Sequence, residues 1–432
     1  MSPNPDIRPW ARKPQHKYIL KNANIVDAAE GRVIPGQSVS LADGKIVSIS
    51  NGAIDDAGFT SIDATGMYLC PGLIDCHVHI SFTPGTDTLG DLFGVDARES
   101  YFRQPWVCNE MLKKGFTSVR DTGGATFALK EAIADGVFPG PRLFISGKVL
   151  SQTGGHGDSR ARHEIGSCCG GRISSHCQQI CDGVPDCLRA ARQELRIGAD
   201  FVKVMAGGGV ASPFDAVSDI QFTPEEVKAI TTVAKGRGTY VTAHAYTPDA
   251  IKMAIENGVQ CIEHGNLIDA EVAKLMADND VYLVPTLVAY SEMGDSRWAG
   301  FLPPKNLDKN AQILDRGLES LRIARDAGVT TCFGTDLLGP LVSAQTKEFA
   351  IRSQVLSALE ILQSATTKAA KLVRHEGSLG QIKEGFIADI LVLNANPLDD
   401  ITIFDKHTEH LCTVIKEGRV EFSRWQNLPP DV

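Results

Sequence analysis

Apolar and polar positions alternate over short runs at both ends of the chain. Residues 18–50 contain β-branched and apolar runs that are interrupted at 30–32 and 42–45 by polar, Gly-containing segments. Residues 388–398 and 411–422 repeat this pattern, with a similar interruption at 416–419. Alternation with Gly-containing turns is typical of β-hairpins. The two terminal segments therefore predict a small β-sandwich domain built from both ends of the chain.

The middle of the chain combines apolar strand-like runs with helical periodicity. One helical pattern, residues 223–238, opens with Thr223, Pro224 and Glu226, which are a cap residue, a proline for the first turn and an acid. Eight strands with interposed helices predict an α/β fold, a (β/α)8 TIM barrel. The eight strand-like runs are residues 72–79, 116–121, 142–147, 200–206, 240–245, 261–265, 281–286 and 330–336.

These patterns predict three parts of the chain. Residues 1–17 form a polar N-terminal arm, residues 18–70 plus 378–432 form the small β-sandwich domain, and residues 71–377 form the barrel. A long insertion follows the third barrel strand. Insertions on barrel loops tend to shape substrate pockets.

The charge balance narrows the range of partners. The 432 residues include 43 basic and 52 acidic side chains, a net charge of −9, and no basic block, which argues against nucleic acid and anionic membranes as partners. No window approaches the roughly 18 to 20 unbroken apolar residues of a membrane span. The N-terminus lacks the apolar core of a signal peptide, so we expect a cytoplasmic protein.

Ionisable residues gather at the predicted carboxyl ends of the barrel strands, which is where barrel enzymes carry out catalysis. One such residue alone is usually an ordinary core or loop residue, but six at one rim indicate a site. The six are His77, His79, Lys203, His244, His264 and Asp336.

The residue types indicate a site for two divalent metal ions. Such ions bind neutral imidazoles and anionic oxygens, which His and Asp supply. Strand alternation puts His77 and His79 on one face and directs Cys76 to the other, so Cys76 is not counted as a ligand. Burial and positive neighbours would lower the pKa of Lys203, and its neutral amine can add carbon dioxide to form a bridging carbamate. The alternative is an ordinary lysine that points outward.

Several motifs together resemble the amidohydrolase superfamily, from about residue 18 to near residue 422. Within it, residues 203–230 are similar to the subgroup of metal-dependent prolidase-like dipeptidases and fungal ochratoxinase. The motifs are "PGLIDCHVH", "VKVMAGGGV", "VTAHAY", "IEHG", "GTD" and "GSLGQIKEGFIADILVLNANPL".

The resemblance implies a binuclear site, usually zinc. It assigns His77, His79 and Asp336 to one Zn²⁺ ion and His244 and His264 to the other, with N6-carboxylated Lys203 bridging both. A hydroxide held between the ions would attack the amide carbonyl. Asp336, with His264 and Lys203 in the catalytic set, would take the proton and pass it to the leaving amine. The resemblance also implies that His156 and Tyr246 contact the substrate.

The implied activity is hydrolysis of an amide bond that releases a free amino acid. The small-molecule substrate would be an N-acyl amino acid, a dipeptide such as Xaa-Pro, or an ochratoxin A-like amide. Family members commonly form even-numbered homo-oligomers, so we expect one here. The alternatives are a cyclic amide hydrolase of the imidazolonepropionase kind and a non-catalytic barrel scaffold, which intact ligands at all six positions disfavour.

Further features remain open on the sequence alone. Cysteines between residues 168 and 187, with His176, form either a zinc knot or a set of free thiols. The glycines at 207–209 have the freedom to let backbone N–H groups approach an anion. Other candidate substrate contacts are Arg160, Arg162, Tyr290 and Trp298.

Overall fold

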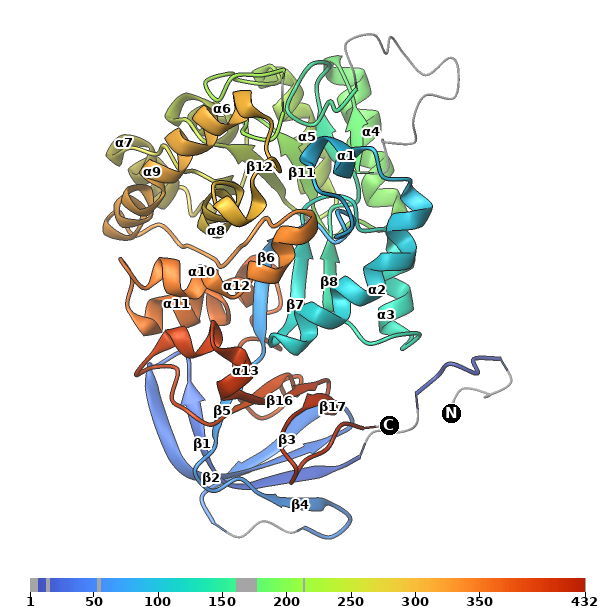
Figure 1. The fold of residues 1–432 in the computed structure, drawn as a ribbon, viewed down its shortest axis with the longest axis vertical. Coiled ribbons are helices and arrows are strands. Elements are labelled where there is room, and N and C mark those ends of the chain that lie inside the picture. The colour runs from blue at the N-terminus through green and yellow to red at the C-terminus, as the bar shows by residue number, and fades with distance from the viewer. Residues whose placement is uncertain (1–6, 13–15, 53–55, 161–176, 213, 432) are drawn as a thin grey trace.

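The computed structural model describes residues 7–12, 16–52, 56–160, 177–212 and 214–431. A strand-rich region containing segments from both ends of the chain lies at one end of the molecule, and a larger region of strands and helices lies at the other (Figure 1). The predicted α/β content is therefore confirmed.

The strand-rich region is one hydrogen-bonded sheet of eight strands. The strands follow the order β17-β16-β15-β5-β1-β2-β3, and β4 pairs with β1. The two-layered sandwich stays a prediction. The strands are β1 (Tyr18–Asp27), β2 (Arg32–Ala42), β3 (Lys45–Ser50), β4 (Thr60–Asp63), β5 (Tyr68–Pro71), β15 (Ile390–Leu393), β16 (Leu411–Lys416) and β17 (Arg419–Ser423).

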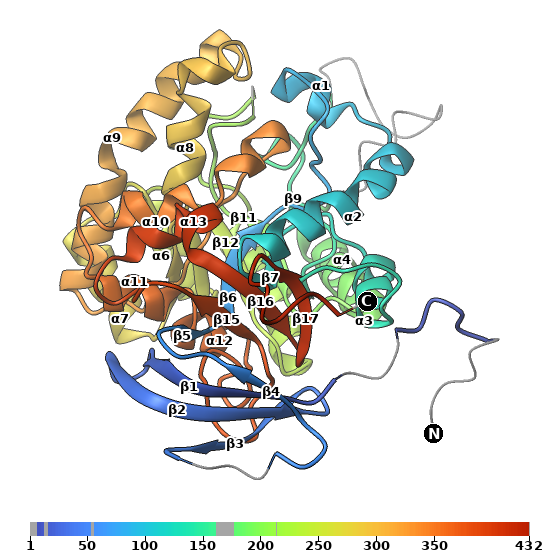
Figure 2. The same ribbon diagram turned by 60° about the horizontal axis from the view of Figure 1, so that its bottom comes forward.

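Two features connect the sequence pattern to this sheet. The turns at Asp43–Gly44 and Glu417–Gly418 have positive φ at both residues, as a two-residue hairpin turn requires. The N- and C-terminal strands meet where β5 pairs antiparallel with β15, and Figure 2 shows the blue and red strands side by side. The sheet therefore depends on chain segments from both ends.

The larger region contains two parallel sheets. One has the order β6-β7-β8 and the other β10-β9-β11-β12-β13-β14. Seven of the eight predicted strand-like runs contain one of these strands. The strands are β6 (Leu73–Val78), β7 (Phe116–Asp121), β8 (Arg142–Ile145), β9 (Val149–Ser151), β10 (Gln178–Ile180), β11 (Val202–Met205), β12 (Val241–Ala245), β13 (Cys261–His264) and β14 (Tyr282–Val284).

The eighth predicted strand, residues 330–336, is not a regular strand. It makes a single parallel bridge to β14, between Thr331 and Leu283. Its backbone nevertheless bonds to a strand on each side, because Cys332 N donates to Leu283 O (2.8 Å) and Phe333 O accepts from Cys76 N (2.8 Å). The segment thus connects the six-stranded sheet to β6 of the three-stranded sheet.

The helices follow the strands in the order that a βα repeat predicts. The predicted helix at 223–238 is α5, where Thr223 and Glu226 form a complete capping box. The helices are α1 (Leu89–Phe93), α2 (Ala97–Lys113), α3 (Phe127–Ala134), α4 (Gly183–Ile197), α5 (Pro224–Gly236), α6 (Pro248–Glu256), α7 (Ala270–Asp278), α8 (Leu287–Met293), η2 (Ser296–Trp298), α9 (Pro304–Asp326), η3 (Gly339–Ala344), α10 (Lys347–Arg352), α11 (Ala358–Ser364), α12 (Thr367–Leu372), η4 (Ile401–Phe404) and α13 (His407–His410).

The helices bury their apolar faces against the strands. In the six-stranded sheet, Val204 and Ile262 pack with Ile230 of α5 and Ile251 of α6, and all four are essentially inaccessible to solvent. Burying each such side chain stabilises the fold by about 1.5–3 kcal/mol. In the described residues, no helix combines the length and apolar character needed to cross a membrane.

Candidate active site

The six predicted ligand residues line a single cavity of about 570 Å³. His77 belongs to β6 and His79 follows it, while Lys203, His244 and His264 belong to β11, β12 and β13. Asp336 ends the segment that connects β14 to β6. All the lysine and histidine members are buried. The polar positions singled out in the sequence therefore come together in space.

His77, His79 and Asp336 form the most compact part of the cluster. The Nε2 atoms of His77 and His79 lie 3.3 and 3.2 Å from the same carboxylate oxygen, Asp336 Oδ1. One ligand atom from each residue lies within 4.8 Å of the others. Burial opposes the charge, but the imidazoles hold the pKa of Asp336 well below its usual range. Two imidazole nitrogens and an ionised carboxylate are a donor set that fits a divalent ion.

Asp336 also contacts the other predicted ligand group. Its second oxygen, Oδ2, lies 3.9 Å from His264 Nδ1, and the His264 ring lies 4.6 Å from the His244 ring, centroid to centroid. Burial, together with nearby Lys203, lowers the pKa of both histidines well below the usual value. Burial also lowers the pKa of Lys203 to about 8. His244 and His264 are therefore poor cations, which suits them to a site for metal ions, and Lys203 loses its proton more readily than an exposed lysine.

Two of these residues have a backbone conformation that non-glycine residues seldom adopt. His264 has a φ of 74° and Asp336 a φ of 53°. At His264 the left-handed conformation breaks the alternation of the strand, so that consecutive residues Glu263 and His264 both contact His77. Left-handed non-glycine backbone of this kind clusters at active sites, and here it occurs at two residues of the same cavity.

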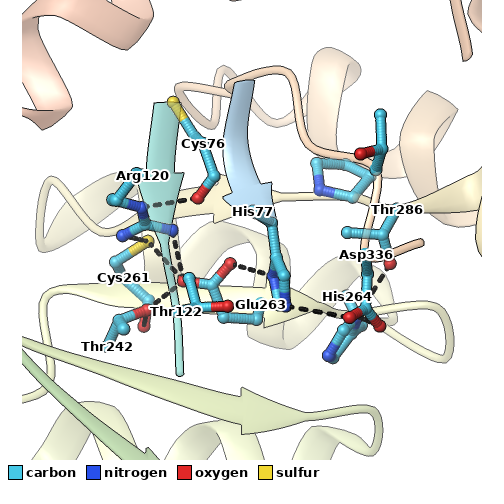
Figure 3. A network of polar contacts seen from close by, with 12 residues as sticks. Cys76, His77, Arg120, Thr122, Thr242, Cys261, Glu263, His264, Thr286 and Asp336 are labelled. Carbon is cyan, nitrogen blue, oxygen red and sulfur yellow. Dashed lines mark hydrogen bonds and ion pairs between the residues drawn. The ribbon is translucent and has the colours of Figure 1, made fainter. Parts of the chain in front are cut away.

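A buried ion pair contacts the Nδ1 side of His77, opposite the Nε2 atom that faces Asp336 (Figure 3). His77 Nδ1 lies 2.7 Å from Glu263 Oε2, and the other Glu263 oxygen pairs with Arg120 Nη2. Arg120 is completely buried and also donates from Nε to Cys76 O (2.6 Å). Burial opposes ionisation of Glu263, yet Arg120 and His77 hold its pKa well below the usual range.

This arrangement fixes which ring nitrogen of His77 faces the cavity. The Glu263 carboxylate accepts a hydrogen bond from the Nδ1–H group of His77. Nε2 is therefore the ring nitrogen that is directed at Asp336. Neither Glu263 nor Arg120 was predicted from the sequence. The available signal was a charged residue inside an apolar strand, where the charge must be paired if the strand is buried.

The two predicted substrate contacts line the same cavity. The His156 ring stacks on the His244 ring with centroids 4.4 Å apart. Tyr246 lies edge-on to His244 at 4.9 Å, and its hydroxyl hydrogen-bonds to the hydroxyl of Tyr290 (2.8 Å), which also lines the cavity. Both predicted residues therefore lie beside the metal-ligand candidates.

Other candidates have different surroundings. Trp298 donates its Nε1 proton to Glu292 (3.0 Å). Arg160 forms a two-pronged ion pair with Asp158, and Arg162 falls outside the described residues. Cys76 packs in an apolar cluster with Cys332, as strand alternation predicts.

The expectation that the glycine run offers its N–H groups to a ligand anion is wrong. Gly207 N donates to His244 O and Gly208 N donates to Asp219 O. Gly209 N donates to a carboxylate, but to that of Asp215 in the same loop (3.1 Å). The backbone donors of all three glycines are therefore already paired inside the protein.

The cysteine segment is only partly described. Cys168, Cys169 and His176 lie outside the described residues. Cys181 and Cys187 are free thiols with their sulfur atoms 3.8 Å apart, and Cys177 instead contacts Ser81. Among the described residues, the compact group suited to a metal ion is His77, His79 and Asp336. The described cysteines of the segment, Cys177, Cys181 and Cys187, are thus free thiols, and the zinc-knot alternative stays untested for the others.

Comparisons with known proteins identify the family to which the chain is similar. The model of the Amidohydrolase family matches residues 68–420. The ochratoxinase of Aspergillus niger is 33% identical over 428 residues, covering 94% of this chain and 88% of that protein. A prolidase solved with N-methylphosphonate-L-proline has a TM-score of 0.90 and 40% identity, with 94% of this chain and 100% of that chain covered. A Xaa-Pro dipeptidase solved with bound methionine has a TM-score of 0.83 and 30% identity, with 94% and 100% covered.

The family match extends over most of the chain and includes every candidate ligand. The alignments cover nearly the whole length of this chain and of each relative. The similarity therefore extends to the eight-stranded sheet as well as to the parallel strands. The chain belongs to the amidohydrolase family.

Proposed function

We propose that the protein is a binuclear metal-dependent amidohydrolase that cleaves an amide bond and releases a free amino acid. One observation carries the proposal. The two oxygens of Asp336 face different ligand groups, Oδ1 toward His77 and His79 and Oδ2 toward His264. A carboxylate so placed is suited to a reaction centre between two ions.

The side chains are assigned to metals as follows. His77, His79 and Asp336 would hold one Zn²⁺ ion, and His244 and His264 would hold the other. When bound, the ions supply Lewis acidity that polarises the amide carbonyl and lowers the pKa of water. The support is the donor chemistry of the cluster: imidazole nitrogens, an ionised carboxylate and buried histidines.

Lys203 is proposed to be N6-carboxylated. Its buried amine has a pKa lowered to about 8, so a neutral fraction is available near physiological pH. The neutral amine attacks carbon dioxide, an N–C bond forms, and one proton leaves to solvent, giving a carbamate. The carbamate would add anionic oxygens to the ligand set, which would offset part of the charge of the divalent ions when they are bound. Incubation with ¹³C-bicarbonate should give a carbamate ¹³C signal in the wild-type protein and none in Lys203→Ala.

The remaining side chains handle the substrate and the proton. Asp336 takes the proton from the attacking water and delivers it to the leaving nitrogen, while His264 contacts its second oxygen. His156 and Tyr246 contact a substrate oxygen, either the amide carbonyl or the α-carboxylate. Their support is that both line the cavity beside His244.

The proposed substrates are N-acyl amino acids, dipeptides such as Xaa-Pro, and ochratoxin A-like amides. Support comes from the relatives, which are named as an ochratoxinase, a prolidase and a Xaa-Pro dipeptidase. Family membership itself supports hydrolysis of an amide bond. A homo-oligomer and a cytoplasmic location stay predictions.

The proposed architecture puts this site on a barrel rim. The parallel sheets, joined by residues 330–336 and by the bond from Asp200 N to Ile145 O (2.7 Å), form the (β/α)8 barrel of residues 71–377. Residues 18–70 with 378–432 form the smaller domain. The ligand candidates lie at the carboxyl ends of the barrel strands, where such folds carry their sites.

A substrate panel tests the activity. Purified protein, reconstituted with Zn²⁺, is assayed against N-acyl amino acids, Xaa-Pro dipeptides, ochratoxin A and cyclic amides, and its metal content is measured in the same sample. Release of a free amino acid with two ions per chain is expected. Cleavage of cyclic amides alone would favour the imidazolonepropionase kind, and a metal content near zero would favour a scaffold.

A further inference from the structure

His156 is held by a buried carboxylate that no part of the proposed function uses. Asp215, on the loop after β11, accepts a hydrogen bond from His156 Nδ1 at 3.0 Å. The side chain of Asp215 is 1% exposed and that of His156 is 9% exposed. Because Nδ1 is committed to Asp215, Nε2 is the ring nitrogen left for a ligand in the cavity.

Asp215 is itself anchored from several directions. Its Oδ2 also accepts from Gly209 N (3.1 Å) and from the side chain of Gln221 (3.2 Å), while Lys309 Nζ lies 3.6 Å from Oδ1. Gln221 also accepts from the backbone N of His156 (2.8 Å). Both members of the His156–Asp215 pair are therefore fixed to the same framework.

The glycine run gives the histidine its space. A Cβ added at Gly209 would lie 2.2–2.6 Å from three atoms of the His156 ring, a separation that real Cβ atoms essentially never show. At Gly207 an added Cβ would be 3.4–3.5 Å from its neighbours, an ordinary contact. Gly209 is therefore required where the ring packs, and Gly207 is not.

The position of the ring connects this pair to the candidate metal site. His156 stacks on His244 with an angle of 16° between the ring planes, and His244 in turn contacts His264. A sideways rotation of His156 would remove both the stacking and the direction of Nε2. Side chains that aim a binding residue need such support, since an error of about 1 Å can reduce turnover by about 100-fold.

We propose that Asp215 is a positioning residue that, with Gly209, holds His156 so that Nε2 meets an oxygen of the substrate. This inference rests on the proposed function, because it concerns how the same cavity binds an amide substrate. Asp215 itself does not touch the substrate and acts through His156. The role explains why a buried carboxylate and a glycine meet at one histidine, and why Lys309 of α9 lies beside that carboxylate.

Steady-state kinetics of matched variants test the proposal. Asp215→Ala and Gly209→Ala should each lower kcat/KM by about 10- to 100-fold with an unchanged metal content. Asp215→Asn, which keeps an acceptor for Nδ1, should recover part of this loss. Gly207→Ala should match the wild type. In a His156→Ala background, Asp215→Ala should have no further effect, because the two residues act as one unit.

Two results would overturn the proposal. One is an equal loss from Asp215→Ala with and without His156, which would make Asp215 a general stabiliser of the loop. The other is loss of metal from Asp215→Ala, which would assign Asp215 to support of His244.

An NMR measurement separates this inference from the proposed function. Two-bond ¹H–¹⁵N spectra of protein with ¹⁵N-labelled histidine report the protonated ring nitrogen, and the His156 signal is identified by its absence in His156→Ala. The Nδ1-protonated form is expected in the wild type and a changed signal in Asp215→Ala, whether or not any amide is cleaved. An unchanged signal in Asp215→Ala contradicts the inference even in an active enzyme, while an inactive wild type contradicts only the proposed function.

Discussion

Asp336 combines an unusual backbone conformation with contacts to three imidazoles. Its φ of 53° turns the carboxylate into the cluster, where it lies within 4 Å of His77, His79 and His264. Holding a non-glycine residue there costs of order 1–3 kcal/mol, which the surrounding contacts must offset. A residue held this firmly in place is suited to moving a proton between fixed partners.

Replacement of Asp336 by Asn tests that role. The amide has nearly the same shape, but it cannot accept a proton from water, so kcat should fall by about 10²- to 10⁴-fold. The thermal midpoint of the metal-free protein should stay near that of the wild type. Stopped assays on the best substrate of the panel measure kcat, and wild-type turnover in Asp336→Asn would refute the assignment.

The Arg120–Glu263 pair should be worth far more than a surface pair when it is broken from one side. Glu263→Gln leaves the fully buried Arg120 without its counter-charge, so the free energy of unfolding should fall by about 3–5 kcal/mol. Urea denaturation at pH 7 measures it. The matched control is Glu319→Gln, which breaks an exposed pair with Arg322 and should change stability by less than about 1 kcal/mol.

A double variant separates charge burial from shape. Arg120→Met with Glu263→Gln removes both charges, so it should recover part of the stability that Glu263→Gln loses. A double variant less stable than the sum of the single changes would contradict this explanation.

At the residue scale, the ligand candidates were predictable and their supports were not. His77, His79 and Asp336 are polar residues that follow apolar runs, which is visible in one dimension. Glu263 lies within a strand next to a candidate ligand, and only the left-handed turn at His264 lets both residues contact His77. Asp215 lies on a loop, where no periodicity constrains the direction of a side chain.

At the scale of elements, the spacing of apolar residues and the residues typical of turns predicted the regular helices, strands and hairpins. The capping box at Thr223 and the hairpin turns are local, and the structure has them where the sequence predicts. Residues 330–336 were predicted to be a regular strand and are not one. Gly334 packs closely between Val284 and His77, where an added Cβ would lie 2.4 Å from the Val284 side chain and 3.0 Å from that of His77. That close approach depends on partners far away in the sequence.

Lys114, at the end of α2, predicts a specific dependence of stability on pH. Burial lowers its pKa to about 8 in the folded protein, while its Nζ donates to Val342 O (2.7 Å). Between about pH 8 and the unfolded value near 10.5, the unfolded chain binds more protons than the folded one. This group therefore makes stability rise with pH across that window, by up to about 3 kcal/mol.

The variant Lys114→Met should lack this contribution. The difference in unfolding free energy between Lys114→Met and the wild type should favour the variant most below pH 8 and shrink toward pH 10.5. Urea denaturation at a series of pH values measures the difference, which cancels the other lysines. A difference that stays constant with pH would contradict the predicted shift.

For the whole molecule, metal removal should weaken both activity and the fold. Ions that bind only the folded state add about 4 kcal/mol when present at 1,000 times their dissociation constant. Chelation should therefore abolish turnover and lower the thermal midpoint, and added Zn²⁺ should restore both. The thermal midpoint of His77→Ala should respond less to Zn²⁺, and a response equal to the wild type would contradict the assignment.

The cysteine pair provides a control for the metal count. Cys181→Ser with Cys187→Ser should keep two ions per chain, because the proposed ligands are the histidines, Lys203 and Asp336. Loss of one ion per chain in this double variant, measured by elemental analysis, would indicate a zinc site in the cysteine segment.

At this largest scale, the strand-like and helical runs in the middle of the chain predicted its α/β content, and the division into a barrel and a smaller domain stays a prediction. The strand order was not predictable, because pairing between β5 and β15 involves residues that lie near opposite ends of the chain. The pattern of apolar and polar residues within one segment does not indicate which distant strand pairs with its edge. The shared cavity was inferred only because parallel strands present their carboxyl ends on one side.

The meeting of β5 with β15 has a consequence for the order in which the protein is made. Tyr68–Pro71 leaves the ribosome long before its partner Ile390–Leu393 exists, so one edge of the early strands waits unpaired during synthesis. The parallel strands that carry the histidines are complete by then. The strand-rich sheet can therefore be completed only after the parallel strands that carry the histidines have been made, and its early strands are open to mispairing until then.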